Sequence, residues 1–542
     1  MRWNVKERKS KDILTHILEI RGIKELREDF LNPKDPNDLA AFQVGIDEVQ
    51  LNKAVKRIKK AIKDKETVVV YGDYDVDGVS ATAIMWESLH KMGVKVWPYI
   101  PDRKSEGYGF SKEGIINVKR ERNPSLIITV DHGITAAEYV KPLRDDGIDV
   151  IITDHHQAPK KSELKKLQEA AHAVVHTTSL AGAGVSWFVA KQLNGSENNP
   201  DHLALAAFGT IGDLLPLTAA NRQIVSHGLP LLANSNRVGI RSLLQESGLL
   251  GTELDPYHIG YVLGPRINAA GRLDNALEAL RLLCTNDESA AIALAQKLGG
   301  LNRKRQLMTK EQIDISLEQL KGVKGMPSLL ILADSSYDEG IIGLLAGNLS
   351  QRYYRPAIVI SQKEKGVSKA SARSIPGVDI IGLIRQVEDK LISVGGHTMA
   401  AGFSLATEDI SQVAEDLIQK ASDQIEPELL ERVLDIDAQL QLEEITRVLL
   451  DEIEKLKPFG SQNQRPVFSL NQMYLDDVRV VGKSGDHLKV KVNGIDAIGF
   501  SKAHLLEKID IKEPVDVAFT LDLNKWNGNE ILQLMIKDIR QD

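Results

Sequence analysis

The sequence predicts an α/β protein with three parts: a doubly wound, mainly parallel sheet, a second α/β domain joined to it by a long helix, and a C-terminal β-barrel. Three observations support this prediction. Short apolar runs without alternation lie between helical stretches in residues 67–154, which is typical of parallel strands covered on both faces. Residues 286–321 are polar and helix-favouring, with few breakers. Beyond residue 433, short alternating strands dominate, as in small barrels.

Size and composition are those of an intracellular enzyme. A chain of 542 residues suggests about three or four domains, and 42% hydrophobic with 26% charged residues is typical of a soluble globular protein. The N-terminal residues lack the apolar core of a signal peptide, and no apolar stretch approaches the ~20 residues that span a bilayer. The single cysteine, Cys284, excludes an internal disulfide and a thiolate metal cluster. We therefore expect a cytoplasmic protein without membrane association.

The net charge of −7 is weak evidence about partners. It argues at first against nucleic acid, but phosphate binding needs only a local basic groove. Carboxylates that hold cations also count as negative in the sum, although the occupied site is not. A nucleic-acid partner therefore stays open at this stage.

The elements of the first domain follow in chain order. Apolar residues at helical spacing predict a helix over 51–64, and we interpret the basic residues between them as a solvated face. The predicted elements that follow are a strand at 67–71, a helix at 78–91, and strands at 94–97, 126–130 and 150–153.

The later elements divide the rest of the chain. Residues 286–321 predict a connecting helix or helix pair, and a second α/β unit begins near Pro327, with strands at 328–333 and 357–361 around a helix near 343–351. C-terminal strands are predicted at 477–481, 487–492, 515–523 and 530–536, with a tight turn at Asn527-Gly528. This pattern suggests an OB-fold, although periodicity alone does not separate it from another small barrel. The domains we predict are an N-terminal segment on the core (1–48), a first α/β domain (49–285), a connecting helix (286–323), a second α/β domain (324–428) and an OB-like domain (429–542).

Three acidic clusters follow predicted strands directly. They are Asp73, Asp75 and Asp77 after 67–71, Asp131 after 126–130, and Asp154-His155-His156 after 150–153; Asp213 follows a separate small, apolar segment. Ligands of doubly wound sheets bind beyond the carboxyl ends of the strands, so these clusters should meet at one edge. Such close carboxylates repel one another unless cations intervene.

The combined pattern predicts a metal site, although each part alone has a simpler interpretation. An Asp-Gly pair such as Asp77-Gly78 is usually a turn, and a histidine pair is usually structural. Three clusters at successive strand ends favour a site for two ions. Oxygen ligands with one or two imidazoles suit Mn²⁺ or Mg²⁺, which can clamp a phosphate, activate water and stabilise a leaving oxygen.

These residues resemble the DHH phosphoesterase superfamily, named for the motif here written Asp154-His155-His156. Within it the sequence is similar to the RecJ family of single-stranded-DNA exonucleases, over nearly the whole chain. The matching segments are 71–78 (its first motif), 264–273 (after the catalytic domain), 371–374 and 395–402 (the DHH-associated domain) and 458–460 (the entry to the OB-fold).

The resemblance implies roles for individual residues. It implies metal ligation by Asp75, Asp77, Asp131, His155 and Asp213, with Asp73 as a further ligand and with Asp154 and His156 as ligands or directly behind them. All of these except Asp73, together with His397, form the implied catalytic set. The implied substrate contacts are Arg266, Asn268, Arg272, Ser371, Arg373, Gly395 and Gly396.

The local sequence leaves two of these groups open. The glycines beside His397 would let a backbone approach phosphate closely, but they fit a tight turn equally well. Arg266, Arg272 and Arg373 suit phosphate contacts, but each could equally be a structural ion-pair residue. For both groups the resemblance favours the functional interpretation.

Several residues depart from the family pattern. Tyr337-Asp338-Glu339-Gly340 stands where relatives have Trp-His-x-Gly, and Ala370 replaces a glycine. Gln462 and Gln464 replace glycine and proline, and His176 replaces asparagine. None removes an expected metal ligand, so the departures concern the path of DNA and the partner contacts.

We expect metal-assisted hydrolysis of single-stranded DNA. The resemblance implies 5′-to-3′ polarity, release of 5′-mononucleotides and a role in DNA repair and recombination. A phosphodiesterase for short oligonucleotides or cyclic dinucleotides is one alternative, and a non-catalytic single-strand-binding scaffold is another. A single-strand-binding protein and a helicase are the protein partners considered, and we expect a monomer.

Overall fold

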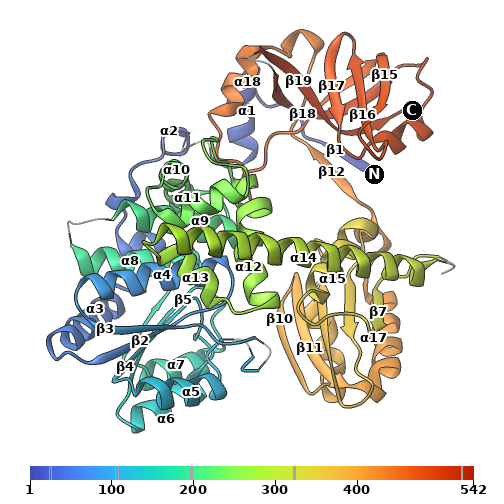
Figure 1. Ribbon diagram of the computed structural model, residues 1–542. Helices are drawn as coiled ribbons and strands as arrows, with labels where there is room; N and C mark the ends of the chain where they lie inside the picture. The colour runs from blue at the N-terminus through green and yellow to red at the C-terminus, as the bar shows by residue number, and fades with distance from the viewer. Residues whose placement is uncertain are drawn as a thin grey trace. The chain divides into compact units, whose positions relative to one another are not determined.

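The computed structural model describes residues 1–23, 25, 27–103, 105–107, 109–195, 199–321, 325–526 and 529–541. The chain forms two compact units, each described here by itself (Figure 1). The larger unit comprises residues 3–271, 276–296 and 435–542, and the smaller comprises 1–2, 272–275 and 297–434. Among the described residues, no helix has the length and apolarity needed to cross a membrane. The predicted turn at Asn527-Gly528 lies outside the described residues.

The first domain of the larger unit contains a five-stranded sheet in the order β3-β2-β4-β5-β6. Every neighbouring pair of its strands is parallel. The strands are β2 (Thr67–Tyr71), β3 (Lys95–Tyr99), β4 (Leu126–Val130), β5 (Asp149–Asp154) and β6 (Ala173–His176). Strands β2 to β5 coincide closely with the strands predicted at 67–71, 94–97, 126–130 and 150–153, whereas no strand was predicted at β6. The central strands β2, β4 and β5 are buried nearly throughout, which is why their sequences are apolar runs.

Helices cover both faces of this sheet (Figure 1). On one side lie α3 (Glu48–Lys63), α4 (Val76–Lys91) and α8 (Gly182–Asn194), and on the other lie α5 (Lys112–Arg122), α6 (Ala137–Asp145) and α7 (Lys161–Ala170). Beyond α4 and α8 the chain adds α9 (Pro200–Gly212), α10 (Ala219–Ala233), α11 (Val238–Glu246), the π-helix η4 (His258–Leu263), α12 (Gly264–Leu273) and α13 (Leu277–Cys284). The solvated face expected on α3 has one exception, since Arg57 is buried and pairs with Glu66 and Asp149.

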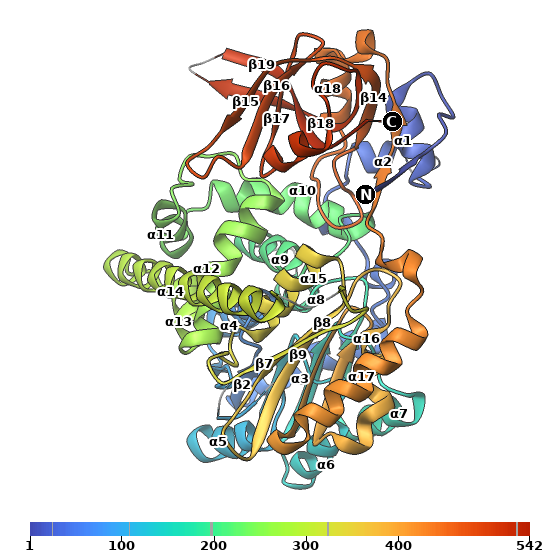
Figure 2. The same ribbon diagram turned by 90° about the vertical axis from the view of Figure 1, so that its right-hand side faces the viewer.

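The C-terminal part of the larger unit is a seven-stranded, mainly antiparallel sheet in the order β13-β14-β18-β19-β17-β16-β15 (Figure 2). Its elements are β13 (Ala438–Gln439), α18 (Arg447–Glu454), β14 (Phe468–Met473), β15 (Leu475–Val481), β16 (His487–Val492), β17 (Ile495–Gly499), β18 (Val515–Trp526) and β19 (Asn529–Arg540). Its core also contains side chains of α1 (Ile13–Ile20) and Phe30 of α2 (Arg27–Leu31). The N-terminal β1 (Arg2–Val5) pairs with β12 (Val433–Ile436).

The smaller unit has a mixed five-stranded sheet in the order β10-β11-β9-β8-β7. Only β7 and β8 are parallel; the other pairs are antiparallel. Its elements are β7 (Leu330–Asp334), α15 (Ile342–Tyr353), β8 (Ala357–Ser361), β9 (Val367–Arg373), α16 (Ile380–Ile384), β10 (Ser393–His397), β11 (Ala400–Ala406) and α17 (Ile410–Gln424). The sequence predicted β7, β8 and α15 but no strand at β9, β10 or β11.

One long helix, α14 (Glu288–Leu320), follows the first domain and leads into the second. The sequence predicted a helix or a helix pair here, and the chain forms a single helix of 33 residues. The fold class is thereby confirmed: a parallel doubly wound domain, a long helix, a second α/β domain and a C-terminal β-module.

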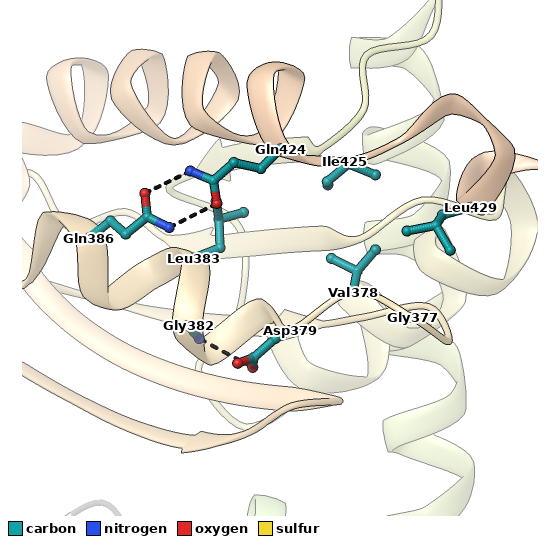
Figure 3. Close-up of a pocket in the computed structure, with 9 residues that line it drawn as sticks. All are labelled: Gly377, Val378, Asp379, Gly382, Leu383, Gln386, Gln424, Ile425 and Leu429. Carbon is teal, nitrogen blue, oxygen red and sulfur yellow. Dashed lines mark hydrogen bonds between the residues drawn. The ribbon is translucent and has the colours of Figure 1, made fainter.

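A pocket of about 290 Å³ lies in the smaller unit beside α16 and α17 (Figure 3). Gln386 and Gln424 exchange two side-chain hydrogen bonds of 2.9 and 2.8 Å at one end of it. Its lining contains none of the residues that the sequence analysis assigned to the site.

Candidate metal centre

The carboxyl edge of the parallel sheet positions the predicted ligands. Asp75 is the N-cap of α4, and its Oδ1 accepts hydrogen bonds of 3.0 Å from the backbone N–H groups of Asp77 and Gly78. Asp131 follows β4, while Asp154 ends β5 and is followed by the two histidines. Asp213 is the C-cap of α9. Residues from three of these segments reach one place because parallel strands end at a common edge, and the end of α9 adds Asp213 to them.

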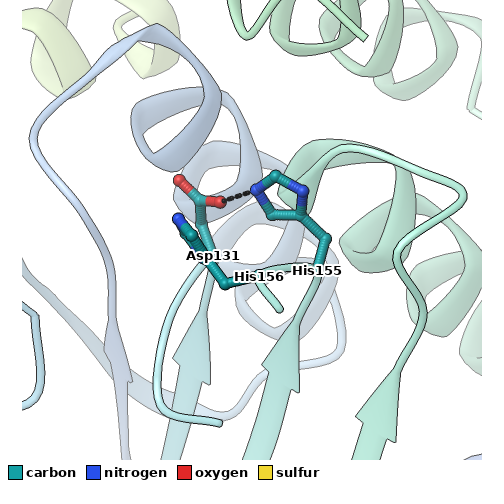
Figure 4. A group of neighbouring side chains, drawn as sticks. All are labelled: Asp131, His155 and His156. Carbon is teal, nitrogen blue, oxygen red and sulfur yellow. Dashed lines mark ion pairs between the residues drawn. The ribbon is translucent and has the colours of Figure 1, made fainter. Parts of the chain in front are cut away.

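His155 lies at the centre of the cluster. Its Nε2 is 3.0 Å from Oδ1 of Asp131, 3.6 Å from Oδ2 of Asp213 and 3.7 Å from Oδ2 of Asp77. Figure 4 shows Asp131 directed at the His155 ring, with His156 beside it. Three overlapping triads could each hold an ion: Asp131 with His155 and His156, Asp77 with His155 and Asp213, and Asp73 with Asp75 and Asp131.

Asp154 orients the two histidines instead of facing the cluster. Its Oδ1 accepts hydrogen bonds from the backbone N–H groups of His155 (2.6 Å) and His156 (3.0 Å), and lies 2.8 Å from Nδ1 of His156. Its Oδ2 accepts a 2.8 Å hydrogen bond from the backbone N–H of Ile134. Burial acts to raise its pKa, but these hydrogen bonds hold the pKa of Asp154 below its ordinary value. An ionised, buried carboxylate thus fixes the His156 ring and the backbone of both histidines, as carboxylates behind metal ligands commonly do.

Asp77 is held by the N-terminus of α8. Its Oδ2 accepts a 2.6 Å hydrogen bond from the N–H of Gly182, and its Oδ1 accepts a 2.9 Å hydrogen bond from the N–H of Ala183. Two free N–H groups at a helix start favour negative charge. The carboxylate of Asp77 is therefore fixed by backbone that the sequence alone did not connect with it.

Two glycines lie so close to the carboxylates of the metal centre that a side chain at either position would clash with them. A Cβ atom on Gly182 would lie 2.4 Å from Oδ1 of Asp131, and one on Gly209 would lie 2.3 Å from Oδ1 of Asp77. Contacts this short do not occur between real atoms, so any larger residue would displace the carboxylates. Neither position could be predicted from the sequence, because each glycine lies far along the chain from the carboxylate that it would contact.

Asp131 is held in an unusual state. Its φ of 69° is in the left-handed region, which costs energy for a residue with a side chain and is common at functional sites. Its side chain is buried, and the polar group beside its Oδ1 is Nε2 of His155 at 3.0 Å. A buried carboxylate oxygen that faces an imidazole and other carboxylates would be stabilised by a cation.

The electrostatics of the cluster fit a divalent cation. Burial, reinforced by neighbouring carboxylates, raises the pKa of Asp77 to about 7 and the pKa values of Asp73 and Asp213 to about 8. The same causes raise the pKa of Asp131 well above its ordinary value. These carboxylates repel one another without a cation, and Mn²⁺ or Mg²⁺ matches a set of carboxylate oxygens with imidazole. The residues present therefore fit the two-ion site predicted from the sequence.

The predicted substrate contacts in the larger unit have identifiable partners. Arg266 pairs with Glu246, Nε to Oε2 at 2.6 Å, and donates to the carbonyl of Val262. Asn268 accepts a 2.7 Å hydrogen bond from the N–H of Val76, at the start of α4. Both side chains thus have structural partners, and their contacts with DNA stay predictions.

The smaller unit contains the other predicted contacts. Arg373 donates a 3.2 Å hydrogen bond to Ser371 Oγ on β9, and Arg272 donates a 3.1 Å hydrogen bond to the carbonyl of Gly340. His397 is exposed at the end of β10, in the hairpin with β11, and Gly396 has a φ of 146° that disfavours a larger residue. Gly395 precedes it on the same strand. Their roles stay predictions.

The departures from the family pattern are structurally accommodated. Tyr337 is buried, with its Oη 2.8 Å from Ser316 Oγ, and Glu339 pairs with Lys363 and Lys369 at 2.9 Å each. The buried Ala370 lies on β9. In the larger unit, Nε2 of His176 lies 2.7 Å from the carbonyl of His156. Gln462 has a positive φ of 54°, and the carbonyl of Gln464 accepts a 2.7 Å hydrogen bond from Arg21.

Comparison with known proteins gives concordant matches. Three domain families match the chain, described as "DHH family, N-terminal domain" over 67–210, "DHHA1 domain" over 326–426 and "RecJ OB domain" over 436–538. The single-stranded-DNA-specific exonuclease RecJ of Bacillus subtilis is 36% identical over 94% of this chain, which spans 65% of that relative's length. The protein of the same name from Dickeya dadantii is 30% identical, with 90% of each chain covered.

Solved structures agree with these matches. A crystal structure of RecJ in complex with Mn²⁺ from Thermus thermophilus matches 100% of this chain and 80% of that chain, with a TM-score of 0.86 and 27% identity. The corresponding Mg²⁺ complex matches 100% of this chain and 78% of that chain, with a TM-score of 0.80 and 26% identity.

Proposed function

Because this chain belongs to the RecJ family of single-stranded-DNA-specific exonucleases, we propose that it hydrolyses single-stranded DNA from the 5′ end and releases 5′-mononucleotides. The reaction depends on two Mn²⁺ or Mg²⁺ ions and serves DNA repair and recombination. The observation that carries the proposal is the cluster of Asp77, Asp131 and Asp213 around Nε2 of His155.

The chain's own residues hold and orient the reacting groups. Asp73, Asp75, Asp77, Asp131, His155 and Asp213 would hold the ions, with His156 beside them. When bound, such ions lower the pKa of a coordinated water and stabilise charge on a phosphodiester. Asp154 keeps the His156 ring and the backbone of both histidines in place, and two N–H groups at the α8 N-terminus fix the position of the Asp77 carboxylate. The protein thus supplies a rigid, largely buried frame, which electrostatic catalysis requires.

We propose that the remaining predicted residues bind the DNA strand. Arg266, Arg272, Ser371 and Arg373 would contact phosphates, and His397 with Gly395 and Gly396 would approach a phosphate oxygen. The domain limits proposed are the N-terminal segment 1–48, the catalytic domain 49–285, the connecting helix 286–323, the substrate-binding domain 324–428 and the OB domain 429–542. A monomeric state, a cytoplasmic location and partnership with a single-strand-binding protein and a helicase rest on family membership alone.

The rival enzyme is a phosphodiesterase for short oligonucleotides or cyclic dinucleotides. The C-terminal match described as "RecJ OB domain" favours a long strand over such a small substrate. The test is cleavage of a long single strand, labelled at its 5′ or 3′ end, in parallel with a dinucleotide and a cyclic dinucleotide, all with Mn²⁺. Immediate release of the 5′ label as mononucleotide, with gradual shortening of the 3′-labelled strand, supports the proposal. Faster cleavage of the dinucleotide or the cyclic dinucleotide contradicts it.

A further inference from the structure

Two exposed tyrosines stack on each other on the surface of the catalytic domain. The ring centroids of Tyr257 and Tyr261 lie 4.9 Å apart with an interplanar angle of 24°. Their residues are 62% and 71% exposed, so each ring keeps most of its surface in solvent. A single exposed aromatic residue is ordinary, but two that stack on each other outside the core form a flat, rigid surface.

The pair occupies a segment with unusual backbone. Tyr257 is the N-cap of η4, a π-helix over His258–Leu263 that runs directly into α12. Ile259 and Leu263 are buried and anchor this segment, which packs on α9. π-Helical turns are rare and occur frequently at functional sites. The tyrosines are thus on the solvent side of a well-anchored element.

The position of this segment connects two parts of the larger unit. Just before this segment, Pro256 lies close to Gly460 at the entry to the C-terminal domain: a Cβ added to Gly460 would be 4.0 Å from the Cβ of Pro256. Just after it, in α12, Asn268 accepts a hydrogen bond from the N–H of Val76, which lies between Asp75 and Asp77 of the metal centre. The tyrosine pair is therefore on the stretch of chain that runs from the C-terminal domain to the metal centre.

We propose that Tyr257 and Tyr261 are a stacking platform for bases of the single-stranded DNA that passes between the C-terminal domain and the metal centre. The inference rests on the proposed function and adds a substrate-binding site to it. Aromatic faces bind bases of any sequence, which suits a nuclease that must accept every nucleotide. Charged residues close to the pair in the chain have partners of opposite charge, Asp255 with His258 and Arg266 with Glu246, so we expect the platform to act through stacking.

The test is binding of single-stranded oligonucleotides that contain one 2-aminopurine, whose fluorescence falls when it stacks on an aromatic ring. Full-length protein is titrated in EDTA, so that no hydrolysis occurs, with the probe base placed in turn along the strand. We expect quenching at a position that the Tyr257→Ala/Tyr261→Ala variant abolishes, with Kd raised about tenfold or more. The Tyr257→Phe/Tyr261→Phe variant should bind and quench as wild type does, because it keeps both rings.

Phe42→Ala is the matched control, since Phe42 is 69% exposed and lies outside the segment. Unchanged Kd and quenching in the double alanine variant would overturn the inference. Wild-type protein is also assayed for cleavage of a long single strand with Mn²⁺. This assay distinguishes a failure of the proposed nuclease function from a failure of the proposed stacking platform. If that strand is cleaved but the alanine variant binds normally, only the platform is wrong; if wild-type protein cleaves no strand, the proposed function is wrong.

Discussion

Oδ1 of Asn268 accepts a 2.7 Å hydrogen bond from the backbone N–H of Val76, the first residue of α4. The next two N–H groups of that helix, at Asp77 and Gly78, are bound by Asp75. The three N–H groups of the metal-binding turn are thus all satisfied, and one of them depends on a side chain 192 residues away. α12 therefore fixes the loop that carries the first ligands.

Removal of this amide should loosen the metal-binding turn. We expect Asn268→Ala to fold but to lower kcat on single-stranded DNA about tenfold and to need more Mn²⁺ for half-maximal rate, since the lost bond is worth roughly 1–3 kcal/mol when its partner stays buried. The measurement is a Mn²⁺ titration of the hydrolysis rate. Asn32→Ala, which removes an exposed hydrogen bond to Glu28, is the control. An Mn²⁺ dependence equal to that of wild type would contradict the prediction.

A methyl group at Gly182 should disrupt the metal centre directly. Its Cβ would lie 2.4 Å from Oδ1 of Asp131, so the carboxylate must move. We expect Gly182→Ala to lose most Mn²⁺ binding, measured by calorimetry, and at least about 100-fold of its activity. Gly300→Ala serves as the control, because a Cβ there has only one neighbour, at 4.0 Å. A normal Mn²⁺ affinity in Gly182→Ala would contradict the prediction, because the metal centre would then bind Mn²⁺ despite the displaced Asp131 carboxylate.

Arg222 should hold the C-terminal domain against the catalytic domain. This buried guanidinium donates to the carbonyls of Phe30 (2.7 Å), Leu456 (2.8 Å) and Lys457 (2.5 Å). Burial lowers its pKa to about 10, so it stays charged at neutral pH. We expect Arg222→Met to lower the free energy of unfolding by about 3 kcal/mol or more, because several buried carbonyls lose their donor. Urea unfolding measures this, and a loss below about 1 kcal/mol would contradict it.

The buried Glu87 should make stability depend on acid pH. Burial acts to raise its pKa, but hydrogen bonds from His202 and Arg237 lower it to about 2. A carboxyl group whose pKa is lowered in the folded state adds stability at pH values above its pKa in the unfolded chain, which is about 4.5. This stability is lost as the pH falls toward 2. The contribution at pH 7 is roughly 3 kcal/mol. We expect the stability difference between wild type and Glu87→Gln, measured with urea from pH 7 to 3.5, to be constant above about pH 5 and to shrink below it.

The sequence predicted the central strands of the parallel sheet well because these strands are buried on both faces, but it did not predict β6. Apolar runs at residues 67–71 and 126–130 coincide with β2 and β4. Strands β9, β10 and β11 were not predicted, since small residues and glycines such as Gly395 and Gly396 give little strand propensity. Those strands form through antiparallel pairing, which is a long-range property of the chain.

The ligand set could be predicted for the same reason that the sheet could. Asp75, Asp131 and His155 follow strand ends, so topology brings them together. The supporting contacts could not be predicted, because Gly182 and Asn268 lie about 100 to 200 residues from their partners, Asp77 and Val76. Local sequence contains no information about such distant pairs.

The most direct test of the metal centre is hydrolysis of a 5′-labelled single strand by wild type and by Asp131→Asn, each with Mn²⁺. Asparagine keeps the size of the side chain but removes the charge at the buried carboxylate beside Nε2 of His155. We expect wild type to release labelled mononucleotide and Asp131→Asn to be slower by at least about 1,000-fold while keeping the circular dichroism spectrum of the folded protein. Wild-type rates in Asp131→Asn would contradict the account, because hydrolysis would then not depend on this cluster.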